Sequence, residues 1–257
     1  MEWIRRRAGS LLAVGLVLGI GWTVAVTTSM PNWFDSDEAC ALRFGGADSS
    51  NVEVHTGWFP PSATCDFGNG NVQDYISPTR SAVLSVTGVL ILVVLLAGLA
   101  LTVRRLTGEP GPQRTADGID LAKRRRNQLT FGALDLAVVV AVLTAGNAFA
   151  IVLGGLPGGI LFALATATGL SALAVVLDRH LGPLPSTALD SRRRGTTAGL
   201  IVFAAIFAAT AITGQMPFFR LWAAPLGAIA YAVVVAVQWS RLPHYRRDHR
   251  TTHQSVG

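Results

Sequence analysis

Long apolar stretches alternate with short polar segments along the whole of this 257-residue chain. A bilayer core about 30 Å thick is crossed by roughly 20 helical residues, because each residue rises about 1.5 Å. Six stretches have this length and lie near residues 10–28, 81–103, 130–153, 158–177, 197–215 and 220–239. The pattern therefore predicts an all-α bundle of six transmembrane helices.

The polar segments between these stretches differ in basic content, and the difference predicts an orientation. Eighteen of the 21 basic residues fall in alternate segments, whereas Arg43, Arg80 and Arg220 fall in the others. Lys and Arg are retained on the cytoplasmic side during insertion, so both termini are expected to be cytoplasmic. The predicted organisation is a cytoplasmic N-terminus with helix one at 1–28, an extracytoplasmic loop at 29–80, helix two at 81–103, a cytoplasmic loop at 104–129, a helical hairpin at 130–177, a cytoplasmic loop at 178–196, a second hairpin at 197–239 and a cytoplasmic tail at 240–257.

Composition supports a membrane protein and excludes an ordinary soluble domain. Hydrophobic residues make up 51% of the chain and charged residues only 14%, with a mean hydropathy of +0.46. The basic residues stand in short runs at the ends of apolar stretches, and they do not form one basic surface of the kind that binds nucleic acid. We therefore expect a plasma (inner) membrane location, anionic lipid headgroups as partners, and no nucleic acid.

The first apolar stretch has a second interpretation. Arg5–Arg7 followed by Leu11–Ile20 is also typical of a secretory signal peptide. The apolar run continues past Trp22 to about Thr28, and no clean small-x-small cleavage site follows it. We favour a retained membrane anchor, with cleavage near Ser29 as the alternative.

The segment 29–80 is acidic and holds both cysteines of the chain, Cys40 and Cys65. Outside the cytoplasm thiols oxidise, so a disulfide is expected. The spacing lacks the Cys-x-x-Cys arrangement of redox-active pairs, which favours a structural bond. Since about fifty residues bury little core, closure of this loop, worth about 3.5 kcal/mol, decides whether the segment is ordered.

Alternation at 51–55 predicts a short strand in this loop, and a small hairpin. Four aromatic residues could fill its core, lie on the outer leaflet or form a docking patch: Trp58, Phe59, Phe67 and Tyr75. The acidic residues have no spacing typical of a calcium or zinc site, so a solvated acidic surface is expected.

The loop also carries a resemblance. Cys40 followed by Trp58-Phe59-Pro60-Pro61-Ser62-Ala63-Thr64-Cys65, after an Arg-flanked first helix, is similar to the outer loops of uncharacterised actinobacterial membrane proteins. Those proteins pair an early Cys with Trp-aromatic-Pro-Pro-x-x-x-Cys. The resemblance covers about fifty residues and implies a disulfide-closed extracytoplasmic loop in a polytopic membrane protein, with no substrate assigned.

Three polar residues in the apolar stretches are candidates for an intramembrane site: Asp135, Asn147 and Gln215. Asp135 lies roughly 9 Å into the third helix, where it could pair with Arg104, Arg105 or Arg126 or serve a proton or cation path. Asn147 follows twelve residues later, roughly 120° around the helix, so the two do not share a face. Gly15, Gly19 and Thr23 do share a face, which favours close helix packing.

No catalytic pattern is present in the sequence. There is no phosphate-binding loop, His-Glu-x-x-His, Gly-x-Ser-x-Gly or Cys-x-x-Cys. We therefore assign no catalytic, cofactor-binding or metal-binding residue. The leading hypothesis is a non-enzymatic membrane protein whose 29–80 loop contacts an envelope partner. The alternatives are a small transporter or channel component and a membrane enzyme acting on a lipid-linked substrate.

Overall fold

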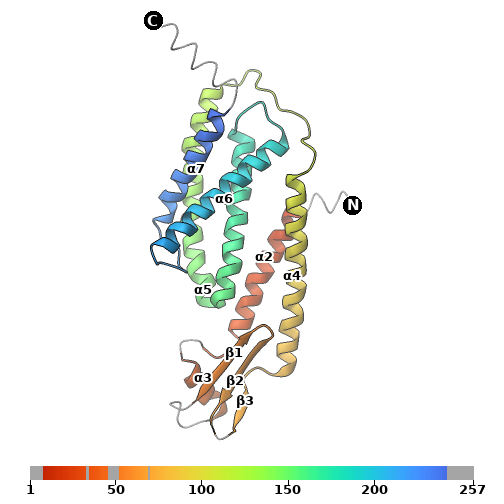
Figure 1. The fold of residues 1–257 in the computed structure, drawn as a ribbon, viewed down its shortest axis with the longest axis vertical. Helices are drawn as coiled ribbons and strands as arrows, with labels where there is room; N and C mark the ends of the chain where they lie inside the picture. The colour runs from red at the N-terminus through yellow and green to blue at the C-terminus, as the bar shows by residue number, and fades with distance from the viewer. Residues whose placement is uncertain (1–7, 33–34, 46–51, 69, 242–257) are drawn as a thin grey trace. The chain divides into compact units, whose positions relative to one another are not determined.

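The computed structural model describes residues 8–32, 35–45, 52–68 and 70–241, which form helices and one small sheet (Figure 1). The elements are α2 (Ala8–Thr27), α3 (Ser36–Phe44), β1 (Glu53–Trp58), β2 (Pro61–Asp66), β3 (Val72–Asp74), α4 (Pro78–Leu106), α5 (Leu121–Leu181), α6 (Ala188–Ile212) and α7 (Ala223–Ser240). The predictions for Arg5–Arg7, for Asn51 and for the tail beyond Arg241 lie outside the described residues.

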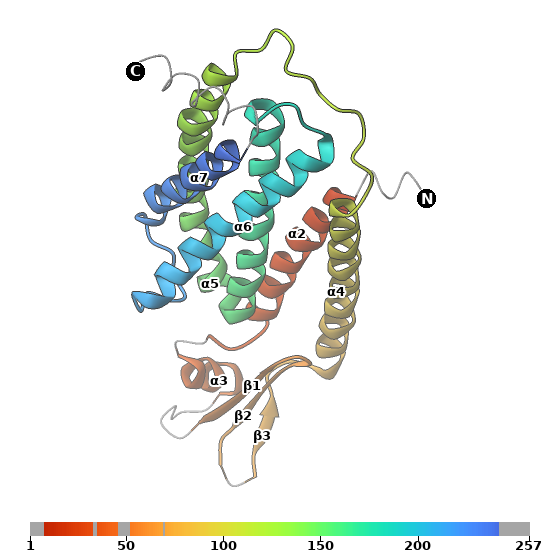
Figure 2. The ribbon, with the colours of Figure 1, turned by 45° about the horizontal axis from the view of Figure 1, so that its top comes forward.

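Five of the described helices are long and apolar enough to cross a membrane: α2, α4, α5, α6 and α7. The predicted third and fourth stretches both fall on α5, which has 61 residues. Gly155 interrupts this helix with φ 59° and ψ −156°, and Pro157 follows. Positive φ suits glycine, since it has no Cβ. Figures 1 and 2 show the ribbon reversing direction within α5.

Helix α6 begins at Ala188, before the apolar stretch predicted from residue 197, because its first turn is capped. The Thr187 hydroxyl accepts a hydrogen bond from the Asp190 backbone N–H (3.2 Å). The Asp190 carboxylate in turn accepts one from the Thr187 backbone N–H (2.8 Å). This capping box satisfies two backbone donors and shortens the α5–α6 loop to residues 182–187.

The chain divides into two compact units, and the first contains the residues up to Val103 together with Phe149–Phe162. In it, α2 and α4 approach closely. A Cβ at Gly98 would lie 2.8 Å from the Leu12 backbone nitrogen, and one at Gly15 would lie 3.0 Å from the Leu95 side chain. The Trp22 indole donates a hydrogen bond to the Leu84 carbonyl (2.8 Å). Glycine thus allows the close helix contact that the sequence predicted, and this contact joins two helices of the same chain.

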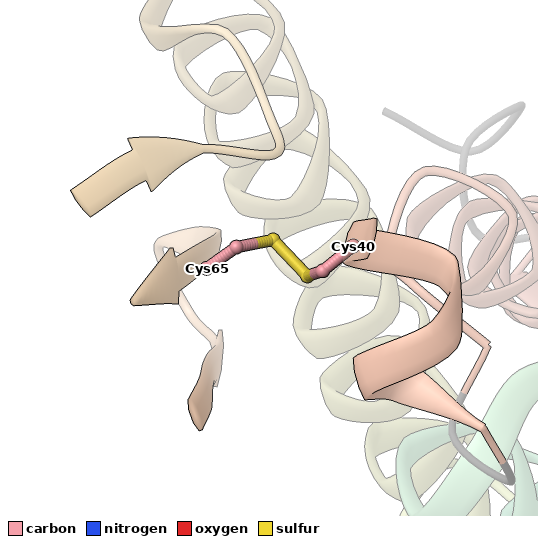
Figure 3. The surroundings of a disulfide bond; sticks show 2 residues. All are labelled: Cys40 and Cys65. Carbon is pink, nitrogen blue, oxygen red and sulfur yellow. A yellow bond between two sulfur atoms is a disulfide. The ribbon is translucent and has the colours of Figure 1, made fainter. Parts of the chain in front are cut away.

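The first unit also contains the lobe formed by α3 and the antiparallel sheet β1–β2–β3. The predicted disulfide between Cys40 of α3 and Cys65 of β2 is present, and both cysteines are fully buried (Figure 3). A small apolar core of Val26, Met30, Ala63 and Ile76 continues from the end of α2 into the lobe, with Trp58 and Tyr75 packed against it. The sheet is more extensive than the predicted hairpin.

The second unit contains Arg104–Ala148 and the chain from Ala163 onward. Its core joins both halves of α5 with α6 and α7 and includes Leu136, Leu170, Val202 and Tyr231. Helix α6 packs directly on the second half of α5. A Cβ at Gly195 would lie 2.4 Å from the Val175 Cα, so this contact tolerates only glycine.

Candidate functional site

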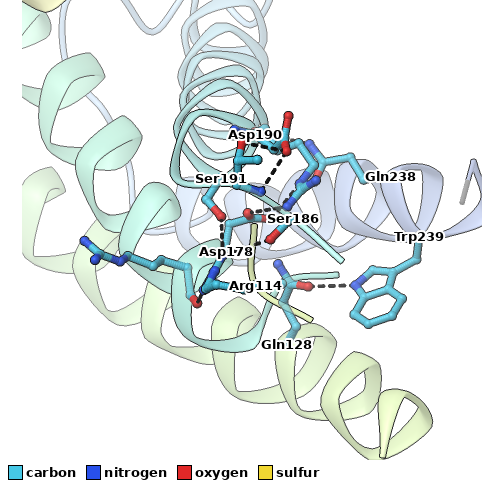
Figure 4. Close-up of polar contacts among 12 residues, drawn as sticks. Arg114, Gln128, Asp178, Ser186, Asp190, Ser191, Gln238 and Trp239 are labelled. Carbon is cyan, nitrogen blue, oxygen red and sulfur yellow. Dashed lines mark hydrogen bonds and ion pairs between the residues drawn. The ribbon is translucent and has the colours of Figure 1, made fainter. Parts of the chain in front are cut away.

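A connected group of polar side chains in the second unit lies at the α5–α6 loop, around Asp178 (Figure 4). The Arg194 guanidinium donates to both carboxylate oxygens of Asp178, at 3.2 Å from Nε and 3.0 Å from the terminal nitrogen. The Asp178 side chain is only 3% exposed and that of Arg194 is 21% exposed. A buried charge of this kind is tolerated only when it is paired, so each residue requires the other.

Arg114 connects the loop after α4 to the α5–α6 loop. Its guanidinium donates to the hydroxyls of Ser186 (2.9 Å) and Ser191 (2.8 Å) and to the Arg179 carbonyl. The backbones of Arg114 and Ser186 also exchange two hydrogen bonds, forming an isolated bridge. We call Arg114, Asp178, Ser186, Ser191 and Arg194 the loop cluster.

Two further arginines donate to backbone carbonyls beside the loop cluster. Arg124 of α5 donates to the Gly182 carbonyl (2.7 Å), and Arg193 of α6 donates to the Leu106 carbonyl (3.0 Å). Both acceptors lie at the C-terminal ends of helices, where unpaired carbonyls favour a cation. These arginines therefore hold the segments after α4 and α5 in place, in addition to any role in setting the orientation of the chain in the membrane.

Helix α7 joins the same end of the unit through amide and indole groups. The Trp239 indole, buried in the core, donates to the Gln128 side-chain oxygen of α5 (2.7 Å). Gln238 donates to the Arg194 carbonyl of α6 (3.1 Å). These two hydrogen bonds tie α7 to α5 and to α6, which fixes the register of the three helices.

The candidate residues Asn147 and Gln215 both support the turn between α6 and α7. The Asn147 oxygen accepts a hydrogen bond from the buried Phe219 backbone N–H (2.8 Å). The Gln215 oxygen accepts one from the Trp222 indole (2.8 Å). Each side chain therefore has a structural partner in residues 214–222.

Asp135 stands apart from the other two candidates. It is exposed on α5, twelve residues and roughly 18 Å along the helix axis from Asn147. Within the described residues its carboxylate has no ion pair with Arg104, Arg105 or Arg126. The structure therefore does not bring Asp135, Asn147 and Gln215 together.

The acidic groups of the lobe also remain separate. His55 lies 3.6 Å from the Glu53 carboxylate, and both side chains are largely exposed. Across the described ranges, no three His, Cys, Asp or Glu side chains group in a way that could hold a metal ion. Elsewhere in the lobe, the Arg43 guanidinium lies 4.3 Å from the centre of the Tyr75 ring, a cation–π contact.

The geometry of the loop cluster indicates a structural role. Its carboxylate is closed off by a bidentate arginine, and its hydroxyls are occupied by Arg114, so no acid–base pair faces open space. Sequence reasoning did not single out Asp178. The available signal was a lone acid at the end of an apolar stretch, facing a run of arginines at 192–194.

Comparison with known proteins gives no relative from which to transfer a function: no family model, no curated protein and no solved structure matches this chain. The similarity of the Cys40–Cys65 loop to actinobacterial membrane proteins therefore stays a prediction.

Proposed function

We propose that this chain is a six-span plasma-membrane protein with both termini in the cytoplasm, which performs no catalysis and presents its disulfide-braced lobe to an envelope partner. Length supports the span count. A straight helix of 61 residues would extend roughly 90 Å, about three times a bilayer core. The non-helical Gly155 divides α5 into two parts that are each long enough to cross a bilayer, and this supports a count of six spans.

Contacts inside the second unit are consistent with this topology. The segments expected in the cytoplasm, 104–129 and 178–196, meet through Arg114 with Ser186 and through Arg124 with Gly182. At the other end of the unit, Asn147 meets the turn at Phe219, and both are expected on the outer side. Segments assigned to the same side are therefore neighbours.

The observation that carries the docking role is the exposure of apolar side chains on an otherwise acidic, covalently braced lobe. Leu42 of α3 is 78% exposed and Val72 of β3 is 54% exposed. The described residues between 29 and 80 include two arginines, Arg43 and Arg80, and six acidic residues: Asp35, Asp37, Glu38, Glu53, Asp66 and Asp74. Large apolar side chains exposed on an acidic surface support a protein–protein contact. The expected partner is a cationic envelope protein.

The transporter and enzyme alternatives lack a comparable observation. A transport path needs its polar groups along one route, whereas Asp135 is separate from Asn147 and Gln215. A transporter would lose cation or proton flux in proteoliposomes on Asp135→Asn. If the flux depends on Asp135, the transporter hypothesis replaces the docking proposal.

Two measurements test the proposal. An impermeant label in intact cells should reach a tag in the turn between β2 and β3 and should not reach a tag after Gly257; the reverse would overturn the topology. A photocrosslinking amino acid at Leu42 should yield one discrete adduct, lost on Val72→Asp, while the same probe at the exposed Gln73 serves as the matched control. No adduct at Leu42 would overturn the docking role.

A further inference from the structure

An apolar groove of about 300 Å³ lies in the first unit, between α2, α4 and the tip of α5. Its walls include Trp22 of α2, Leu92 of α4 and Ile160 of α5, and Phe59 of the lobe lies at its margin. Leu92, Ile160 and Phe59 are each more than half exposed, so the groove is open along one side. This volume is at the lower end of the range for ligand sites.

The wall formed by Trp22 is fixed by its neighbours. The Trp22 indole N–H is occupied by the Leu84 carbonyl (2.8 Å), so it is not offered to a ligand. A Cβ at Gly88 would lie 2.9 Å from the Trp22 ring, which means that the ring rests directly on the α4 backbone. Similarly, Trp58 of the lobe rests on Gly155 at the α5 tip, where a Cβ would lie 2.9 Å from its ring. The groove is therefore largely preformed.

The chemistry of the lining selects the kind of occupant. Every side chain that lines the groove is apolar, and the one polar side-chain atom, the Trp22 nitrogen, is already paired. A ligand with polar groups would lose its hydrogen bonds with water and gain none, so the buried part must be hydrocarbon. Helices α2 and α4 are of the length and hydropathy that cross a membrane, where that hydrocarbon is a lipid chain.

A basic side chain stands where the head of such a lipid would lie. Arg80 is exposed in the first turn of α4, eight residues before Gly88 and so roughly 12 Å along the helix axis. Within the described residues its guanidinium has no ion pair or hydrogen bond with another side chain. A phosphate at this level would meet a free positive charge.

We propose that the groove holds one acyl chain of an anionic phospholipid from the leaflet on the side of the lobe, with the lipid phosphate at Arg80. The proposal rests on membrane insertion of α2 and α4, and it is independent of whether the lobe has a protein partner. The surrounding lipid tails offer the acyl chain the same apolar medium as the groove. Selectivity must therefore come from the fixed shape of the groove and from Arg80.

The full-length chain in phosphatidylcholine nanodiscs, doped with phosphatidylglycerol that carries a photoactivatable acyl chain, tests this. Peptide mapping should place the label on α4 around Leu92 and on α5 around Ile160. Leu92→Trp fills the groove. It should reduce the photolabelling of the peptides that line the groove, here called the groove label, about tenfold, which corresponds to about 1.4 kcal/mol. Val93→Trp is the matched control, because Val93 is equally exposed on α4 but does not line the groove.

Ile160→Trp blocks the opposite wall and should give the same loss, which guards against a folding defect specific to the Leu92 variant. All variants should retain the Cys40–Cys65 disulfide, checked by intact mass without reduction. Arg80→Gln should reduce the groove label from phosphatidylglycerol about fivefold, as expected for one basic group at an anionic surface, and should leave a phosphatidylcholine probe unchanged.

Three results would overturn the proposal. The first is equal labelling of Val93 and the groove residues in the wild-type chain, which is the pattern of unselective surrounding lipid. The second is an equal effect of Leu92→Trp and Val93→Trp. The third is equal labelling by phosphatidylglycerol and phosphatidylcholine probes, which would exclude an anionic lipid. None of these outcomes bears on crosslinking at Leu42, so failure of this proposal and of the docking role are distinguishable.

Discussion

Asp178 and Arg194 form a two-point ion pair across the α5–α6 loop, with nitrogen–oxygen distances of 3.0 and 3.2 Å. Asp178 lies in the last turn of α5, and Arg194 lies two turns into α6. The pair therefore closes a loop of six residues, 182–187. The planar guanidinium fits both carboxylate oxygens at once, which specifies the crossing of the two helices as well as their contact.

Asp178→Asn should destabilise the second unit by about 3 kcal/mol, at the lower end of the range for a broken buried ion pair, since Arg194 remains partly hydrated. Denaturant unfolding in mixed micelles, followed by circular dichroism, measures this. The double variant Asp178→Asn/Arg194→Leu should recover part of the loss, because no buried charge is left unpaired. Asp117→Asn, in an exposed loop, is the control. Equal stability of the Asp178 and Asp117 variants would contradict the structural role of the pair.

Arg114→Lys should release the 107–120 segment from the loop cluster. Lysine cannot donate to Ser186 and Ser191 in the fixed geometry of a guanidinium, so at least one hydroxyl loses its partner. Faster proteinase K cleavage of this segment in inverted membrane vesicles is the expected result. Gln113→Ala changes the exposed neighbouring residue and should leave the cleavage rate unchanged. If both variants are cut at the same rate, Arg114 does not hold the segment.

The features that sequence predicted best are those decided by the local pattern. The apolar stretches coincide with the long helices, because a run of about twenty apolar residues has few alternatives in a bilayer. The Cys40–Cys65 bond follows from there being only two cysteines in an acidic loop. The face of Gly15 and Gly19 packs within the chain, since glycine lets two backbones approach.

The features that sequence missed depend on residues far apart in the chain. Arg114 and Arg194 were interpreted as topology signals, although each also binds a specific partner in the loop cluster. Nothing in a run of arginines shows which one meets Asp178, since this depends on how α5 and α6 cross. Asn147 was selected as a polar residue in an apolar stretch, and its partner is a backbone N–H 72 residues away. Polarity alone therefore could not separate a structural side chain from a transport site.

Replacing both Cys40 and Cys65 by serine should unfold the lobe preferentially. Loss of closure over a sequence separation of 25 residues costs about 3.5 kcal/mol in the chain-entropy model. The lobe has only a small apolar core, so it cannot absorb this loss. Protease added outside spheroplasts should cut the variant between residues 29 and 80, and reduced wild-type protein should behave in the same way. An intact lobe in the double variant would show that the apolar core alone is sufficient.

Gly195→Val should disrupt the packing of α6 on α5. A Cβ at Gly195 would lie 2.4 Å from the Val175 Cα, and because the clash is with backbone the two helices must separate. Overpacking of this kind costs about 3 kcal/mol or more. Gly169→Val is the matched control, since a Cβ there meets nothing within 4 Å. Thermal aggregation of the purified chain in detergent should begin at a lower temperature for the Gly195 variant and be nearly unchanged for the Gly169 variant. Equal onset temperatures would contradict the close contact.

Asn147→Leu should loosen the turn between α6 and α7, because the buried Phe219 backbone N–H would lose its acceptor. Leaving such a group unsatisfied costs about 1–3 kcal/mol. Thr144→Val is the control, because the Thr144 hydroxyl donates its hydrogen bond to the Val140 carbonyl of its own helix. Hydrogen exchange of the 214–222 peptide should accelerate roughly tenfold in the Asn147 variant, the change expected for about 1.4 kcal/mol. Exchange that is unchanged while proton flux is lost would mean that Asn147 serves transport, and the structural assignment would fail.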